Sequence, residues 1–170
     1  VSMAFSEEAP LQQAQFWDAL DSINIHPYYL DLPGVRDPTV EQLKEAFAPE
    51  AERLHALSEK WGKPILICEI GYWSVDTMTQ DYNHLDSSNN IDLQEQTDLF
   101  QAMFETFYGK GWVEGIFCYA YEGASNYAEP WNIHNAYLGK PAENVIRSFY
   151  GAAPLPTPTL VTPPEADLAN

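Results

Sequence analysis

The sequence predicts an α/β fold in which parallel strands alternate with helices. Four apolar, strand-like runs are each followed by a segment whose apolar residues have helical spacing: residues 1–5, 23–29, 64–69 and 112–121. The two longest polar loops, 70–90 and 122–138, both follow a strand and precede a helix, as the loops that carry sites do in a (β/α)8 TIM barrel. A whole barrel needs about 250 residues. A chain of 170 residues therefore predicts either a small four-stranded α/β domain or half of a barrel.

The first two helices are predicted from apolar spacing and capping signals. Residues 11–20 place their apolar side chains on one side of a helix. Thr39 with Gln42 three residues later forms a capping box that begins the second helix. That helix is expected to be interrupted near Pro49, to resume, and to end at Gly62.

The last two helices and a tail complete the chain. Residues 91–108 are strongly amphipathic, and residues 143–150 form a shorter helix. Residues 152–170 are rich in proline and threonine and cannot build a core, which predicts an extended linker or disordered tail. The expected division is therefore one folded unit over residues 1–151 and a tail over 152–170.

The charge restricts the partners. With 25 acidic and 8 basic residues the net charge is −17, which disfavours nucleic acids and anionic membranes. No apolar run reaches the length of a membrane span. Cys68 and Cys118 lie in strand-like runs and are expected to be buried free thiols. The compartment stays open, although the acidic surface and the tail favour a secreted or periplasmic protein.

Sequence motifs for metals and cofactors are weak, so none is predicted. The four histidines lack metal-ligand spacing, and no glycine-rich phosphate loop occurs. The acidic residues of the 74–92 region lack the spacing of an EF-hand loop, which favours a solvated loop.

The candidate catalytic group is the carboxylate of Glu69. It stands at the end of an apolar strand and is followed by Gly71, Tyr72 and Trp73. A carboxylate in such a place lies in a cleft or is paired, because an unpaired buried charge is costly. Aromatic rings beside a carboxylate suit a site that cleaves sugars. The alternative is an acid that caps a loop or forms a structural ion pair.

Five segments in order resemble clan-A glycoside hydrolases, most closely the family 113 β-mannanases. They are FWDALDSINIHPYY (16–29), KPILICEIGYWS (63–74), DLQEQ (92–96), WVEGIF with Tyr119 and Tyr121 (112–121), and GKPA (139–142). The first, second and fourth segments resemble strands six, seven and eight of those barrels. The resemblance thus implies the C-terminal half of a TIM barrel, carrying strands 5–8.

The resemblance also implies a mechanism. Glu69 matches the nucleophile of a retaining glycoside hydrolase that cleaves β-linked glycans, with β-mannan as the best single guess. Clan-A enzymes take the acid/base glutamate from strand four, which would precede Val1. Implied partners are an oligosaccharide or polysaccharide and the missing N-terminal half of the barrel. The isolated fragment is expected to be inactive.

Further candidates come from strand alternation and aromatic content. On the strand over 23–29, His26 and Tyr28 share the polar face, where Tyr28 is expected to hydrogen-bond Glu69 and His26 to contact a sugar hydroxyl or to be a satisfied core histidine. The remaining candidates for saccharide binding are aromatic, and ordinary packing is the alternative for each: Tyr72, Trp73, Tyr119, Tyr121 and Trp131, with His134 beside the last.

Two other functions remain open on the sequence. One is a non-catalytic glycan-binding or degenerate TIM-barrel protein, since tyrosines stand on the last strand where the family tends to have tryptophan. The other is a protein-interaction domain without a sugar ligand.

Overall fold

The computed structural model describes residues 14–28, 30, 32–76, 78–79, 90–121 and 133–155. Within these ranges three parallel strands form one sheet in chain order: β1 (Ile23–Ile25), β2 (Ile65–Ile70) and β3 (Val113–Cys118). The strand predicted at residues 1–5 lies outside the described residues.

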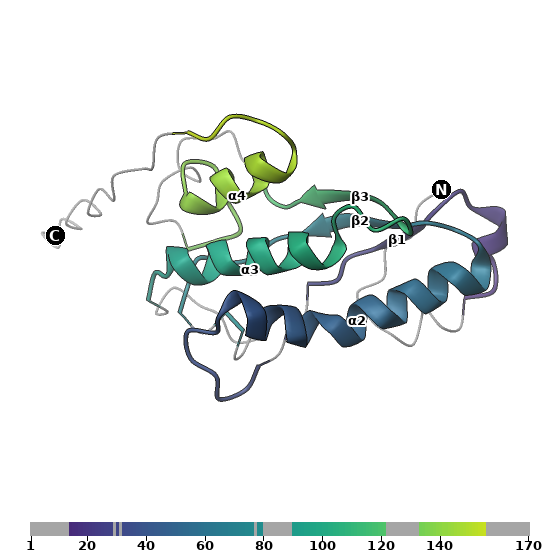
Figure 1. The fold of residues 1–170 in the computed structure, drawn as a ribbon, viewed down its shortest axis with the longest axis horizontal. Helices are drawn as coiled ribbons and strands as arrows, with labels where there is room; N and C mark the ends of the chain where they lie inside the picture. The colour runs from purple at the N-terminus through teal and green to yellow at the C-terminus, as the bar shows by residue number, and fades with distance from the viewer. Residues whose placement is uncertain are drawn as a thin grey trace, which may run out of the picture.

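A helix follows each described strand, so the predicted alternation is confirmed. Helix α2 (Val40–Trp61) lies between β1 and β2, α3 (Leu93–Phe107) between β2 and β3, and α4 (Pro141–Phe149) after β3. In Figure 1, α2 and α3 run side by side along the sheet, and α4 lies beyond α3. This is the arrangement of successive βα units in a parallel α/β fold.

The helix predicted at residues 11–20 is wrong over its described part. Only a single 3-10 turn, η1 (Trp17–Ala19), forms there. Trp17 is fully buried, whereas Phe16 is 39% exposed. The segment is therefore held by one buried side chain and not by an apolar face of a helix. Leu20 has an extended backbone, because the chain must straighten at once to enter β1.

The predicted break near Pro49 is also wrong, because α2 is continuous through it. The capping box at Thr39 and Gln42 is confirmed, and Gly62 ends the helix with φ 62° as predicted. A proline inside a helix costs about 3 kcal/mol. Buried apolar side chains on both sides of Pro49 offset that cost by packing on the rest of the core: Leu43, Phe47, Leu54 and Leu57.

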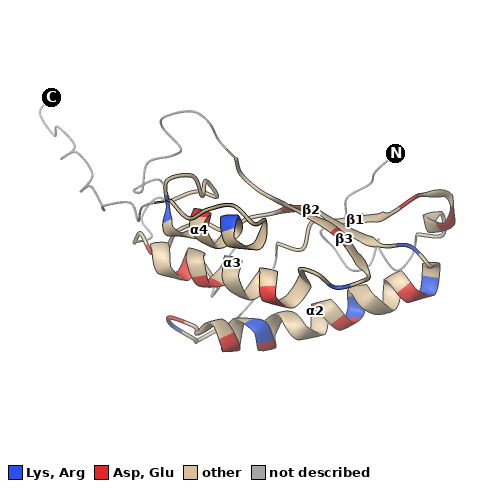
Figure 2. Cartoon of the chain, turned by 45° about the horizontal axis from the view of Figure 1, so that its top comes forward, with Lys and Arg blue, Asp and Glu red and all other residues tan. Residues whose placement is uncertain are grey.

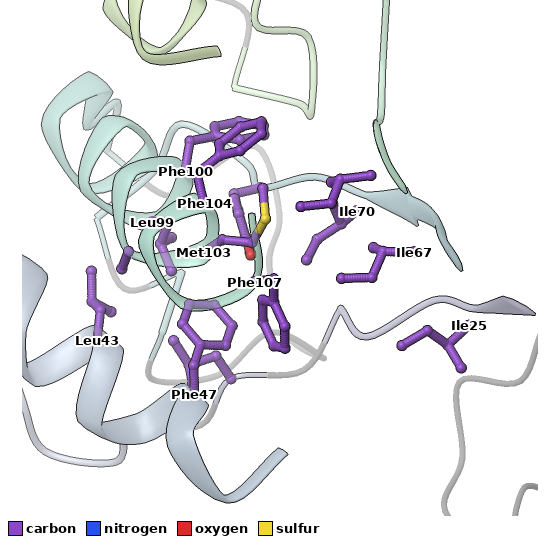
Figure 3. Packing of buried hydrophobic residues seen from close by; sticks show 14 of the residues in the cluster. Ile25, Leu43, Phe47, Ile67, Ile70, Leu99, Phe100, Met103, Phe104 and Phe107 are labelled. Carbon is purple, nitrogen blue, oxygen red and sulfur yellow. The ribbon is translucent and has the colours of Figure 1, made fainter. Parts of the chain in front are cut away.

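The core lies between the sheet and the helices. The buried face of α3 carries Phe100, Met103, Phe104 and Phe107, which gather against the isoleucines of the strands (Figure 3). Charged side chains are concentrated along α2 and α3 (Figure 2). None of the helices in the described part of the chain is both long and apolar enough to span a bilayer.

Both cysteines are free, as predicted, and both are partly buried. Burial raises the pKa of the Cys118 thiol to about 12. The Sγ of Cys68 donates to the carbonyl of Ile25 at 3.5 Å, which links β2 to β1.

The face of β3 opposite its buried Ile116 is open. Phe117 is 61% exposed and Tyr119 is 42% exposed. Since side chains alternate along a strand, both belong to the face that points away from the helices. A whole barrel would enclose this face, and the described residues leave it uncovered.

The beginning of the predicted tail is fixed to α4. Arg147 Nε donates to the carbonyl of Ala153 at 2.7 Å, and the Asn144 side chain bonds both backbone groups of Leu155. The rest of the tail, 156–170, lies outside the described residues.

Candidate active site

An irregularity in β2 decides the direction of the Glu69 side chain. Ile67 pairs with Ile116, but Ile70 pairs with Cys118, so β2 holds one residue more than β3 over this interval. Ile67 and Ile70 are both fully buried, although three positions separate them. Strict alternation would put Glu69 on the side of Ile67, toward the helices. The extra residue lets Glu69 face the open side, where its side chain is 35% exposed.

Two side chains that follow β1 lie at the Glu69 carboxylate. The Tyr28 hydroxyl donates to Oε1 of Glu69, as the sequence predicts. The Nδ1 atom of His26 lies 3.7 Å from Oε2. His26 therefore stands beside the carboxylate itself, with 27% of its side chain exposed.

Basic side chains pair elsewhere in the part of the chain that the structure describes. Among the described residues, lysine and arginine ion pairs include Lys44–Glu105, Arg53–Glu50 and Arg147–Glu143, all on helices. Among the described residues Glu69 thus has hydrogen-bonding and imidazole neighbours, and not the salt bridge of a structural ion pair.

Tyr119 closes the same group from the end of β3. Its ring meets the edge of Tyr28 at 6.5 Å between centroids, and Tyr28 meets His26 at 6.3 Å. The Tyr119 amide donates to the carbonyl of Ile70 at 2.7 Å, which places it next to Glu69. The structure thus brings together Glu69, His26, Tyr28 and Tyr119.

Other predicted aromatic residues have separate places. Trp73 is partly exposed and meets His134 edge-on at 4.6 Å, which joins the loops after β2 and β3. Tyr121 is 73% exposed. Trp131 lies outside the described residues.

The expectation that Tyr72 lines the cleft is wrong. Its side chain is 1% exposed and packs edge-on against Phe100 at 5.1 Å. Tyr72 belongs to the core because the backbone after Glu69 turns it toward α3.

Gly71 has a role in the site that sequence reasoning missed, because only the structure shows how closely another strand approaches it. A Cβ atom at this position would stand 1.8 Å from the carbonyl oxygen of Tyr119. Only glycine therefore lets the end of β2 approach the end of β3 this closely. In the sequence, the one signal for this role is that Gly71 stands two positions after Glu69 at the end of the strand.

The comparison with protein families decides the identity. The family model of Glycoside Hydrolase Family 113 matches residues 5–137. The chain belongs to glycoside hydrolase family 113. A comparison with curated proteins finds no match.

Solved structures agree with this family. A family 113 β-1,4-mannanase is similar at 27% identity with a TM-score of 0.62, over 86% of this chain and 44% of that chain. The β-mannanase of Alicyclobacillus acidocaldarius, solved in complex with ManMIm, has a TM-score of 0.64 at 22% identity, over 86% and 44%. A β-glucuronidase from Faecalibacterium prausnitzii shares the fold alone, with a TM-score of 0.57 at 13% identity, over 92% and 26%.

The family 113 chain therefore spans less than half of the length of its solved family members. Its parallel strands and helices have the architecture of part of a TIM barrel, which confirms the predicted fold class. The site residues described above all lie at the carboxyl ends of the strands, the end that carries active sites in such barrels.

The described residues offer no metal centre to this family 113 chain. No group of three or more histidine, cysteine or acidic side chains within the described ranges is arranged to hold a metal ion.

Tyr72→Phe is expected to leave the free energy of unfolding unchanged or to raise it by up to about 1 kcal/mol. The Tyr72 hydroxyl is buried without a hydrogen-bond partner among the described residues, and burial raises its pKa well above the usual value. Thermal unfolding measures the effect. A large loss of stability would contradict the expected result, and a weakened affinity for saccharide would restore Tyr72 to the site.

Proposed function

We propose that this family 113 chain forms part of a retaining glycoside hydrolase (EC 3.2.1.-) that cleaves β-linked glycans, with β-mannan as substrate and Glu69 as nucleophile. The observation that carries the proposal is the Glu69 carboxylate, which a bulge turns to the open side of the sheet and the Tyr28 hydroxyl holds there. Family membership and the likeness to family 113 β-1,4-mannanases support the choice of substrate.

The proposed chemistry needs two carboxyl groups. In a retaining mechanism they stand about 5–5.5 Å apart; one attacks the anomeric carbon while the other protonates the leaving oxygen. Glu69 would form the glycosyl–enzyme ester, and water activated by the second group would release the sugar with its configuration retained. We assign the second group to a glutamate from the N-terminal half of the barrel, so this chain by itself would show little turnover.

The neighbours of Glu69 have roles in this proposal. Tyr28 holds the carboxylate in one orientation for attack. His26 Nδ1 lies 3.7 Å from Oε2, which is longer than a hydrogen bond, and we assign it to contact a sugar hydroxyl beside the carboxylate. Exposed Tyr119, Tyr121 and partly exposed Trp73 offer aromatic faces on which pyranose rings stack.

The test is an activity assay of the protein that carries this chain together with the upstream half of the barrel. β-1,4-Mannan, β-glucans and xylan are compared as substrates, and proton NMR follows the anomer released first. We expect β-mannan to be cleaved with release of the β-anomer. Absence of hydrolysis on every β-glycan, or release of the inverted anomer, would contradict the proposal.

Tyr28→Phe is expected to lower kcat/KM by roughly 10–100-fold while the fold is kept. The variant removes only the hydroxyl that donates to Glu69 and retains the ring that packs on Tyr119. Steady-state kinetics on mannan oligosaccharides measure the loss. Tyr108→Phe is the matched control, because Tyr108 is 44% exposed among the outer helices and far from the site. Equal kinetics in both variants would remove Tyr28 from the mechanism.

A second candidate function is non-catalytic glycan binding. Tyr119, in the group around Glu69, is 42% exposed, and Tyr121 is 73% exposed; such rings bind sugars whether or not cleavage follows. A saccharide that changes the tryptophan fluorescence of the protein without being hydrolysed would favour this candidate. Hydrolysis that depends on Glu69 would exclude it.

A further inference from the structure

A short segment of the connection between β3 and α4 is bonded from several directions. Residues 133–136, which we call the strap, have no regular secondary structure. The amide of Ser74 donates to the carbonyl of Ile133 at 2.9 Å, and the amide of Ala120 donates to that of Asn135 at 3.3 Å. The strap is thus joined to the loop after β2 and to the end of β3.

A buried lysine makes a third connection. Lys140, directly before α4, is 1% exposed. Its Nζ donates to the carbonyl of His134 at 3.2 Å and to the Ser74 hydroxyl at 2.9 Å. Burying an ammonium group is costly, so this position needs a reason beyond packing.

The buried side-chain amide of Gln96 makes the fourth connection to the strap. Gln96, in the first turns of α3, is fully buried. Its Nε2 donates to the carbonyl of Tyr72 at 2.7 Å and lies 3.4 Å from the carbonyl of Ala136. The carbonyls of all the strap residues, from Ile133 to Ala136, therefore accept a hydrogen bond, each from a different part of the chain.

The strap borders the site on both sides. Its His134 meets Trp73, four positions after Glu69, edge-on. Its partner Ala120 directly follows Tyr119, which packs on Tyr28. Movement of the strap would therefore shift an aromatic wall relative to the carboxylate without touching the carboxylate.

We infer that Lys140 and Gln96 are positioning residues, which fix the strap so that Trp73 and His134 form one wall for a neutral saccharide bound at Glu69. This inference rests on the proposed function. The competing explanation is that the two buried polar groups stabilise the fold and nothing more.

Lys140→Met separates the two explanations. Methionine keeps the unbranched stem and removes the ammonium donor. Ser58→Ala is the matched control: Ser58 is 8% exposed and donates to the carbonyl of Lys63 at 2.7 Å, before β2 and so at the opposite end of the sheet. Both variants are made in the protein that carries this chain with the rest of the barrel.

The first readout is hydrogen exchange, which does not depend on activity. In Lys140→Met the amides of Ser74 and Ala120 are expected to exchange about tenfold faster, with those of α2 unchanged. The second readout is kinetic: KM for mannan oligosaccharides rises about tenfold while kcat changes less than about threefold. Ser58→Ala is expected to show neither effect.

The outcomes are distinct. If the wild-type protein neither binds nor cleaves saccharides, the proposed function fails, and the exchange rates still decide whether Lys140 fixes the strap. The inference would be overturned if the amides of Ser74 and Ala120 exchanged at the wild-type rate in Lys140→Met. It would also be overturned if kcat fell by as large a factor as KM rose. Should Lys140→Met not fold, Gln96→Met is measured with the same readouts and the same expected changes.

Discussion

Glu69→Gln is expected to lower the turnover of β-mannan by about 10⁴-fold or more while saccharide binding is kept. An amide is a poor nucleophile and forms no glycosyl ester, so the first step of a retaining mechanism stops. The geometry should survive, since the glutamine oxygen still accepts the hydrogen bond of Tyr28. Turnover is measured by release of reducing sugar, and binding by the change in tryptophan fluorescence.

The control is Glu105→Gln, which changes a glutamate of α3 that pairs with Lys44 at 2.6 Å. It is expected to leave turnover unchanged. A small external anion such as azide should restore part of the cleavage by Glu69→Ala, because it can attack the anomeric carbon in the space of the missing carboxylate. The product is then the α-glycosyl azide, which is not a reducing sugar and is detected by mass spectrometry. Full activity of Glu69→Ala without azide would remove Glu69 from the chemistry.

Gly71→Ala should lower the free energy of unfolding by about 3 kcal/mol and reduce activity with it. The new Cβ would stand 1.8 Å from the oxygen and 2.8 Å from the carbon of the Tyr119 carbonyl. Since these atoms are backbone, the ends of β2 and β3 must separate, and Tyr119 must move away from Tyr28. Urea unfolding measures the stability, and mannan hydrolysis measures the activity.

Gly111→Ala is the matched control for Gly71→Ala. No heavy atom lies within 4 Å of the Cβ it would add, and Gly111 is not among the glycines with positive φ. Its unfolding free energy should stay within about 0.5 kcal/mol of the wild type or rise slightly. Similar losses in the two variants would show that Gly71 is not a point of close approach.

Much of the fold could be predicted because its signals are local. The capping box at Thr39, the ending at Gly62 and the amphipathic pattern of α3 each depend on residues within a few turns. Alternation along the predicted strand 23–29 grouped His26 with Tyr28, and both meet Glu69, 41 positions along the chain from Tyr28, although β1 ends at Ile25 and both residues follow it. The side chains meet because the carboxyl ends of neighbouring parallel strands lie at the same edge of the sheet.

The local signals failed where packing overrides them. Pro49 stays inside a helix because buried side chains on both sides of it keep the helix together. Trp17 anchors a single turn and not the predicted helix, since β1 begins directly after it.

The sequence by itself determined the order of strands and helices, the acidic charge and the position of a carboxylate at a strand end. Only the tertiary structure decided that Glu69 faces the open side, that Tyr72 is core, and that Lys140 and Gln96 bond the strap. The physical reason is distance along the chain. A bulge exists only relative to a neighbouring strand, and a buried donor has meaning only beside a carbonyl that another element supplies.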